Sequence, residues 1–391
     1  MSAVLEMKRL SVVEGGPLDR LQLRLGLMQM RRPLIMRRAL VFSLIGWLPL
    51  LILASLQGTL FKNVRIPFLY DPSPHIRFLL SIPLLIVAEV VIGPRIVAAT
   101  SHFITSGLIA EDRYRDFDAA IVDASRLRDS TFAEMVILAI TYLGAFLSIR
   151  YFSATASGWQ SFALESGLRF TLAGYWNALV SIPIFQFLVY RWFWRTLIWC
   201  RFLWKVSKLD LQLIPTHPDQ AGGLGFLGET HRLFAIFIFA YAATASAVAC
   251  REVLFDKVPI QTYKIPIAAL IILMLLLFLG PLFMFTPMLL RTRRKALHQY
   301  STLACEIGRL YQQKWVKKII PSNESLLSTG DNTSLANYSH DYDLVDRMRL
   351  IPFEPRAAFV LAIAGLIPMV PLLATVMPME EIFKLALKAL G

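Results

Sequence analysis

Seven long apolar stretches dominate the hydrophobic pattern of the chain, and the loops between them alternate between many and few Lys and Arg. Each stretch is close to the roughly 20 residues that an α-helix needs to cross a 30 Å hydrocarbon core. The pattern therefore predicts an all-α, polytopic transmembrane helix bundle of about seven spans. The expected spans are residues 39–61, 78–98, 135–151, 171–190, 233–250, 265–290 and 357–376.

The composition agrees with a membrane protein. Of the 391 residues, 56% are hydrophobic and only 17% are charged, whereas soluble domains average about 25% charged residues. The net charge of +13 is compatible with nucleic-acid binding, with anionic lipid or with loop orientation. Only the distribution of the basic residues along the chain distinguishes these.

The basic residues lie mainly in alternate loops. Of the 40 Lys and Arg, 30 fall in the amino-terminal arm and in every second connection, and 10 fall in the others. Because Lys and Arg accumulate on the cytoplasmic side of a membrane, this predicts a cytoplasmic amino terminus and an outside carboxyl terminus. Most of the positive charge is thus explained by topology. We expect no nucleic-acid partner, since no recognition helix or stacking surface accompanies the basic residues.

Three of the expected spans have an unusual composition. The second and sixth spans contain prolines and should be irregular. The fifth is rich in Ala, Ser and Thr and should lie inside the bundle. We find no internal repeat that indicates an inverted-repeat transporter.

The spans and loops divide the chain into six regions. The expected regions are 1–38, a cytoplasmic basic arm; 39–100, transmembrane helices 1 and 2; 101–132, a cytoplasmic helical hairpin; 133–290, transmembrane helices 3 to 6 with a glycine-rich loop at 216–231; 291–356, a cytoplasmic helix and linker; and 357–391, transmembrane helix 7 and an amphipathic carboxyl-terminal helix.

The glycine-rich loop before the fifth span is the first candidate site. It concentrates titratable groups and flexible backbone at the membrane surface, and glycines allow close approach of a ligand or of another backbone. The loop is either a contact for a ligand or ion, or a purely structural turn. Its spacing fits no metal template and no βαβ unit surrounds its glycines, so we predict neither a metal nor a cofactor. The candidate contacts are His217, Asp219, Gly222, Gly223, Gly225, Glu229 and His231.

A second candidate is Glu89, which lies within the second span. An ionisable side chain inside a membrane costs several kcal/mol unless it is paired or hydrated, and such residues often mark ion paths. We take Glu89 and Arg95 as the candidate intramembrane ionisable residues. Glu89 is either part of such a path or a structural group, which is neutral or pairs with a polar neighbour such as Arg95 or the Tyr175 hydroxyl.

The fourth span ends in interleaved aromatic and cationic residues, Arg191, Trp192, Trp194 and Arg195. Trp at a membrane boundary typically lies at headgroup depth, while Arg reaches from there toward water. We interpret these four residues as an interfacial belt.

Two motifs carry a resemblance. The loop HPDQAGGLGFLG and the segment MRLIPFEP, which precedes a proline-containing span and PMEEIFKLALKAL, resemble a family of uncharacterised bacterial multi-pass inner-membrane proteins. The resemblance runs from the first span to the end of the chain. It implies a bacterial inner-membrane location and brings no activity with it.

Three functions remain open from the sequence. We favour a transporter or channel-like protein for an ion or small solute. The first alternative is a non-catalytic scaffold or signalling component, and the second is a membrane-embedded enzyme that acts on a lipid-linked or anionic substrate. The expected partners are anionic lipids of the bilayer, a second copy of the chain and a cytoplasmic protein.

Overall fold

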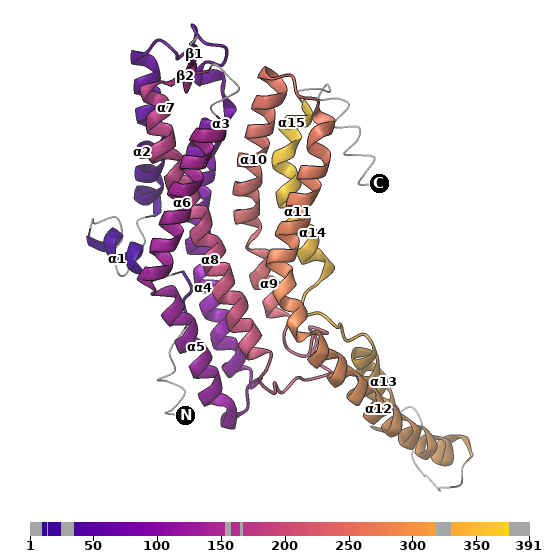
Figure 1. Cartoon of the computed structure of the whole chain (residues 1–391). Helices are drawn as coiled ribbons and strands as arrows, with labels where there is room; N and C mark the ends of the chain where they lie inside the picture. The colour runs from indigo at the N-terminus through magenta and orange to yellow at the C-terminus, as the bar shows by residue number, and fades with distance from the viewer. Residues whose placement is uncertain are drawn as a thin grey trace.

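The computed structural model describes residues 10–13, 15–24, 35–152, 158–164, 167–317, 319 and 330–374. Within these ranges the chain is almost entirely helical, and its long helices form one elongated bundle (Figure 1). The predicted all-α bundle is confirmed. The amphipathic carboxyl-terminal helix and much of the basic arm and linker lie outside the described residues.

Fifteen α-helices are described, joined in places by short 3₁₀ or π-helical turns. The α-helices are α1 (Pro17–Arg24), α2 (Ile35–Leu56), α3 (Pro72–His75), α4 (Ile82–Thr105), α5 (Tyr114–Arg128), α6 (Thr131–Phe152), α7 (Leu172–Trp176), α8 (Ile182–Val206), α9 (Phe226–Arg232), α10 (Ala235–Phe255), α11 (Lys264–Leu279), α12 (Thr286–Tyr311), α13 (Gly330–Asp346), α14 (Pro355–Leu366) and α15 (Val370–Ala374). The shorter turns are η1 (Phe68–Tyr70), η2 (Ile76–Ser81), η3 (Glu111–Arg113), η4 (Asn177–Ser181), η5 (Ile260–Tyr263), η6 (Gly280–Phe285), η7 (Gln312–Val316) and η9 (Ile367–Met369).

Six continuous helical stretches in the described part of the chain are long and apolar enough to cross a membrane. They contain α2, α4, α8, α10, α11 and α14, respectively. A seventh is present if α5 and α6 count as one span bent by 44°. The apolar helices are those of an integral membrane protein, while the count of seven spans stays a prediction.

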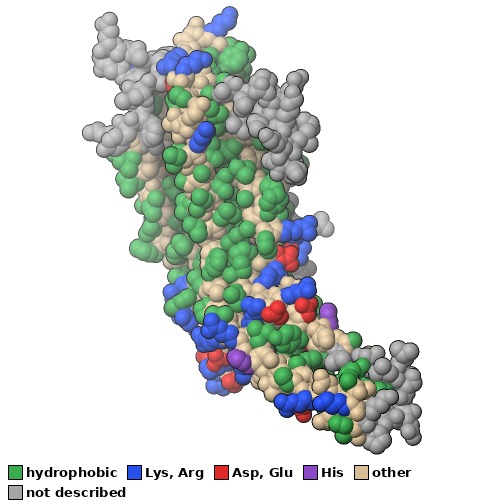
Figure 2. Space-filling view, turned by 90° about the vertical axis from the view of Figure 1, so that its right-hand side faces the viewer, with side chains coloured by type: hydrophobic (Ala, Val, Ile, Leu, Met, Phe, Trp, Pro, Cys, Tyr) green, Lys and Arg blue, Asp and Glu red, His purple; other side chains and the backbone are tan. Residues whose placement is uncertain are grey.

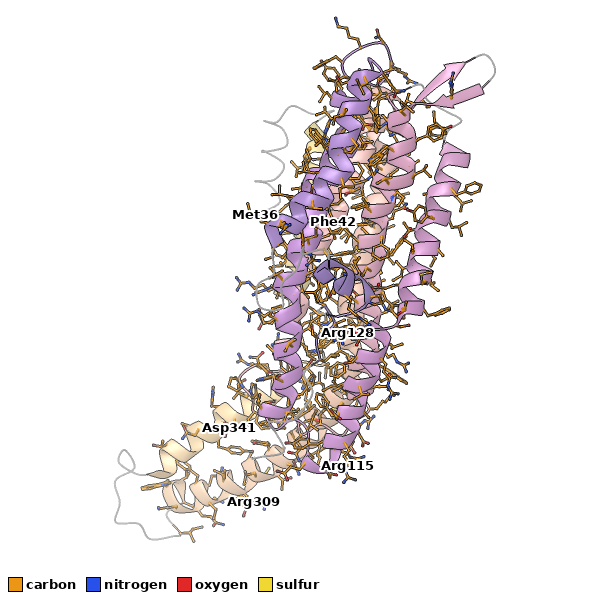
Figure 3. The ribbon with its side chains drawn as sticks, turned by 90° about the vertical axis from the view of Figure 1, so that its left-hand side faces the viewer. Met36, Phe42, Arg115, Arg128, Arg309 and Asp341 are labelled. Carbon is orange, nitrogen blue, oxygen red and sulfur yellow. The ribbon has the colours of Figure 1, made fainter. Side chains whose placement is uncertain are left out.

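The two ends of the bundle differ. At one end, the hairpin end, β1 (Ser161–Leu164) pairs antiparallel with β2 (Gly167–Phe170), an element the sequence did not predict. At the opposite end, α12 and α13 project away from the bundle, with Arg309 and Asp341 on this projection (Figures 1 and 3). We call this end the arm end, after the projection of α12 and α13 and not after the amino-terminal arm. Apolar side chains fill the long middle of the surface, while Lys and Arg gather toward the arm end (Figure 2).

Helix α10 lies at the centre of the bundle. Of its span, 56% is buried, the largest share among the six stretches, and it contacts α3, η2, α4, α14 and α15. Small side chains allow such close approach of helices in lipid. The prediction that the fifth span lies inside the bundle is confirmed.

The helical stretches that contain α4 and α8 begin in the same way. Each starts with a short helix, α3 or α7, whose amino-terminal end is capped by a side chain, that of Asp71 or Thr171. A π-helical turn follows, and its last residue is the Ser of a Ser-Ile-Pro triplet. The two Ser-Ile-Pro triplets, at 81–83 and 181–183, are 100 residues apart. Proline cannot donate a backbone hydrogen bond, so a π-turn before it accommodates the missing donor. The helical stretches that lead into α4 and α8 thus share one local construction.

Candidate functional site

A cluster of buried charges lies between α1, α2, α4, α6 and α8. At its centre, Glu89 is 4% exposed. Its Oε2 accepts a hydrogen bond from Arg38 Nη2 and its Oε1 accepts one from Arg195 Nη1, both at 2.6 Å. Arg191 Nη1 lies 3.6 Å from Oε1. Arginine guanidinium groups therefore occupy both carboxylate oxygens of Glu89.

Arg191 extends the cluster to the amino-terminal arm. Its Nη2 donates to Asp19 Oδ1 of α1 at 2.7 Å, and its Nε lies 3.6 Å from Glu134 Oε1 of α6. Glu134 Oε2 in turn accepts the backbone N–H of Leu18 at 2.9 Å. Three arginines and three carboxylates thus balance in charge. We call these six residues the charge cluster: Asp19, Arg38, Glu89, Glu134, Arg191 and Arg195.

The charge cluster holds the amino-terminal arm between helices. Arg195 Nη2 donates to the Val13 carbonyl at 2.9 Å, and Arg128 Nη1 donates to the Ser11 carbonyl at 2.6 Å. Val13 also packs on Gly93, where an added Cβ would lie 3.2 Å from the Val13 Cβ. Figure 3 shows Arg128 beside this part of the arm. The described part of the arm is therefore tucked into the bundle.

Two sequence interpretations are wrong for this region. Neither Arg95 nor Tyr175 pairs with Glu89, because Arg38, Arg191 and Arg195 take that place. Arg191, Trp192 and Arg195 form no interfacial belt, since they are 4%, 2% and 4% exposed. The carboxylates that neutralise these arginines come from α1, α4 and α6, so α8 turns this face inward. Trp194 is half-buried.

The glycine-rich loop is organised by Asp219. Its Oδ1 accepts the backbone N–H groups of Ala221 and Gly223 at 2.8 and 3.1 Å, and its Oδ2 accepts that of Gly225 at 2.7 Å. Burial alone raises the pKa of this carboxyl, but the three amides and His217 more than offset it and hold the pKa below its ordinary value. His217 Nδ1 lies 2.8 Å from Oδ1. Asp219 is thus the structural centre of the turn.

The loop is also fastened to the segment before α14. The backbone N–H of Arg349 donates to the Gln220 carbonyl at 2.7 Å, and its guanidinium donates to the Asp219 carbonyl. An added Cβ on Gly228 would lie 2.8 Å from the Cα of Phe353. The positive φ of Gly222 and Gly223, 65° and 95°, is adopted by glycine without the steric cost that a side chain would bring. The motifs HPDQAGGLGFLG and MRLIPFEP therefore contact each other.

His231 belongs to the interior. It is 1% exposed, its Nε2 accepts a hydrogen bond from Trp199 Nε1 at 2.9 Å, and its Nδ1 contacts the Phe278 carbonyl. Both ring nitrogens are occupied, so His231 is wrong as a surface ligand contact. Of the predicted loop contacts, Glu229 lines a cleft. Among the described residues, no three His, Cys, Asp or Glu side chains are grouped to hold a metal ion.

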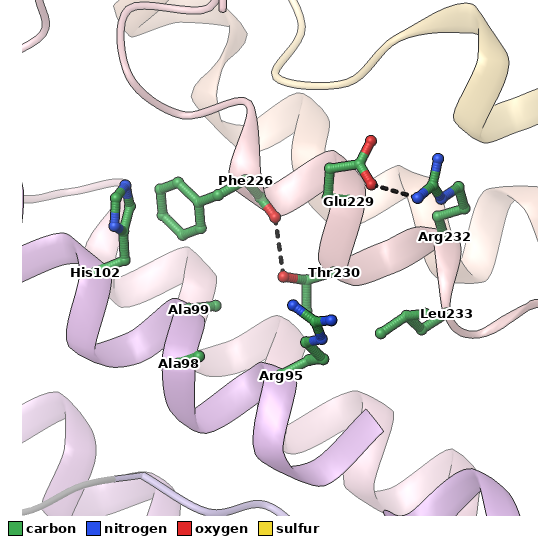
Figure 4. A pocket seen from close by; sticks show the side chains of 9 residues that line it. All are labelled: Arg95, Ala98, Ala99, His102, Phe226, Glu229, Thr230, Arg232 and Leu233. Atoms are coloured by element: carbon green, nitrogen blue, oxygen red, sulfur yellow. Dashed lines mark hydrogen bonds and ion pairs between the residues drawn. The ribbon is translucent and has the colours of Figure 1, made fainter. Parts of the chain in front are cut away.

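That cleft lies between α4 and α9 and has a volume of about 270 Å³ (Figure 4). It combines cationic side chains with small apolar ones. Glu229 and Arg232 form an ion pair of 2.6 Å on one wall. Arg95 is exposed on α4. We call this site the basic cleft; its lining residues are Arg95, Ala98, Ala99, His102, Phe226, Glu229, Thr230, Arg232 and Leu233.

A row of hydroxyl groups lies along the contact of α10 with η2 and α3, nearer the hairpin end than the basic cleft. Ser81 Oγ donates to the Ala240 carbonyl at 2.8 Å, and Thr244 Oγ1 donates to Ser81 Oγ at 2.9 Å. Nearer the hairpin end, Ser73 Oγ donates to the Ala247 carbonyl at 3.4 Å. Because the helices are antiparallel, these contacts lie one above another. We call Ser73, Ser81 and Thr244 the hydroxyl seam.

Sequence reasoning missed the seam, because Ser and Thr within apolar spans are common and only their partners reveal the row. The same holds for Arg38, whose side chain is 2% exposed and contacts Glu89.

In the comparisons with known proteins, no family model, no curated protein and no solved structure matches this chain.

Proposed function

We propose that this membrane protein moves an ion or small polar solute across the membrane along the hydroxyl seam. The observation that carries the proposal is the row of Ser73, Ser81 and Thr244 between packed helices, with the basic cleft further along α4 toward the arm end. A membrane interior without such groups offers a polar solute no hydrogen bonds, and unsatisfied polar groups there are costly. The seam supplies hydroxyls and carbonyls in sequence.

The seam is closed, since its hydroxyls bond to each other and to α10 carbonyls. Passage therefore requires α10 to separate from α4. Small side chains on α10 such as Ala240, Ala243 and Ala247 interlock little with a neighbour and favour such movement. The π-turn η2 on the opposite side of the contact is a further point of backbone adjustment.

Glu89 has a different role in this proposal from the one its position in the sequence suggested. Arginines take both carboxylate oxygens, so a cation can bind there only if buried ion pairs break first. We assign Glu89 to locking the amino-terminal arm and the first helices, rather than to the path.

We further propose that the arm end faces the cytoplasm of a bacterium and that the protein resides in the inner membrane. The excess of Lys and Arg in the loops at that end supports the orientation. The resemblance of the glycine-rich loop and of MRLIPFEP supports the location.

The first test measures solute flux into liposomes that contain the purified protein, with and without the hydroxyl groups of the seam. We expect Ser81→Ala combined with Thr244→Val to lower flux of the transported solute about tenfold, the effect of roughly 1.4 kcal/mol on the barrier. Proton, potassium, chloride and phosphate fluxes would be measured in turn. Flux equal to wild type in this variant, for a solute that wild type moves, would contradict the seam as the path.

The shared construction supplies a matched control. Ser181 occupies the place of Ser81 in the stretch that leads into α8, and its Oγ donates to the Gly46 carbonyl at 2.7 Å. Ser181→Ala removes an equivalent hydrogen bond outside the seam. We expect it to keep flux within about twofold of wild type. An equal loss in both variants would indicate a general packing defect instead.

A second candidate function rests on the projection formed by α12 and α13. Arg293 Nη2 bonds the Asp346 carbonyl at 2.6 Å, and apolar Leu303 and Leu310 on α12 are 43% and 54% exposed. This surface favours a scaffold that binds a cytoplasmic protein. We expect Leu303→Glu combined with Leu310→Glu to release any protein that co-purifies with wild type under gentle extraction. Unchanged recovery of that protein would count against this candidate.

A further inference from the structure

The length of the helical stretch that contains α4 indicates where the basic cleft lies relative to the apolar core of a membrane. Helix α4 and its π-turn descend continuously from Ile76 near the hairpin end. At 1.5 Å per residue, about 20 residues cover the 30 Å hydrocarbon core. Counting from Ile76, this length ends at Arg95. The cleft is therefore about one core thickness away from Ile76, the distance at which headgroups are expected.

Arg95 differs from the arginines of the charge cluster. Arg38, Arg191 and Arg195 each contact at least one carboxylate, whereas Arg95 has no ion pair or hydrogen bond within the described residues. A guanidinium group offers five donors in a planar fork that matches the oxygens of a phosphate. Arg95 is thus a cation in a concave site with its donors available.

The rest of the lining limits the kind of anion. Glu229 neutralises Arg232, so an anion would approach from the side of Arg95 and His102. Ala98, Ala99 and Leu233 provide an apolar wall. The volume of about 270 Å³ lies just below the roughly 300 Å³ at which pockets for drug-sized ligands begin. A small anionic group with an apolar portion fits these features.

We propose that the basic cleft binds the phosphate group of a phosphate ester, with Arg95 as its principal ligand. The phosphate can belong to a lipid headgroup or to a soluble ester. The claim that a phosphate ester is the transported substrate rests on the proposed function. The claim that the basic cleft binds phosphate is independent of transport.

The test is binding to the full-length protein in neutral detergent. Retention of phosphatidylglycerol and, separately, of phosphatidylcholine is measured by native mass spectrometry, and binding of glycerol 3-phosphate by isothermal titration. We expect Arg95→Gln to weaken binding of phosphatidylglycerol or glycerol 3-phosphate about tenfold, since one charge-assisted pair contributes roughly this factor. Arg37→Gln is the matched control, because Arg37 is also exposed at the arm end of its helix but lies outside the cleft.

The outcomes separate the sources. Arg95-dependent retention of phosphatidylglycerol supports a lipid headgroup, and Arg95-dependent binding of glycerol 3-phosphate supports a soluble ester. Equal binding in wild type, Arg95→Gln and Arg37→Gln, or binding of none of the three probes, would overturn the proposal. Binding without flux would contradict transport alone, while flux without Arg95-dependent binding would contradict the phosphate site alone. Thermal unfolding of Arg95→Gln at the wild-type temperature would exclude a folding defect.

Discussion

Glu89→Gln is expected to destabilise the protein by about 3–5 kcal/mol, the cost of removing one partner from a buried ion pair. The loss is large because Arg38 and Arg195 both bond to this carboxylate at 2.6 Å and both are buried. An amide retains one acceptor but no charge, so three buried arginines would face two carboxylates. Thermal unfolding in detergent measures the change, and proteolysis after residue 24 reports release of the amino-terminal arm.

Asp123→Asn is the control for this prediction. Asp123 also contacts two cations, Arg201 and Lys205, at 3.0 and 2.8 Å. Its side chain is 32% exposed, so solvent screens these pairs and each should contribute below about 1 kcal/mol. If Glu89→Gln unfolds no earlier than Asp123→Asn, the charge cluster is not the lock we describe. Because Glu89→Gln should destabilise the fold, a loss of flux in this variant would indicate a folding defect and would not by itself place Glu89 on a transport path.

Asp219→Ala is expected to release the glycine-rich loop from the MRLIPFEP segment and to cost roughly 2–4 kcal/mol. Three backbone N–H groups lose their shared acceptor, and hydrogen bonds to a charged group are each worth about 1.5–3 kcal/mol, with imperfect additivity. Hydrogen exchange at 220–228 and 348–354 should accelerate in this variant. Asp210→Ala, in the same connection with a side chain 95% exposed, should leave exchange unchanged.

The same carboxylate predicts a pH dependence. Its pKa is lower in the folded protein than its ordinary value, which is about 3.9 for a free aspartate. The stabilisation is therefore fully present above that pH and is lost as the pH falls toward the folded-state pKa. Loop protection in wild type should decline below about pH 3.9, while Asp219→Ala should lack this component. Equal acid sensitivity in both proteins would contradict the assignment.

Much of the fold was predictable because hydropathy reports it directly. A helix such as α10 must satisfy its backbone internally and expose apolar side chains to lipid, so its length and its small residues indicated both its span and its central place. The interrupted sixth span was equally visible in Gly280 and Pro281, where the 3₁₀ turn η6 is found.

The site was less predictable because its residues acquire meaning only from partners distant in the sequence. Glu89 stood out as an acid in a span, but Arg38 and Arg195 are 51 and 106 positions away. The tryptophans and arginines of α8 have the composition of an interfacial belt, and only the carboxylates of α1, α4 and α6 turn them inward. Asp219 was named as a candidate ligand contact, and its role as an acceptor for its own loop became visible only from the turn geometry.

The docked amino-terminal arm sets an order of biosynthesis. Its contacts come from Arg128, Glu134, Arg191 and Arg195, so roughly half of the chain must leave the ribosome before the arm finds its place. At about 5–20 residues per second, translation leaves it waiting for around ten seconds or more. Arg38 and Glu89 pair without a contribution from the arm, so we expect the arm to dock only after α8 supplies Arg191 and Arg195.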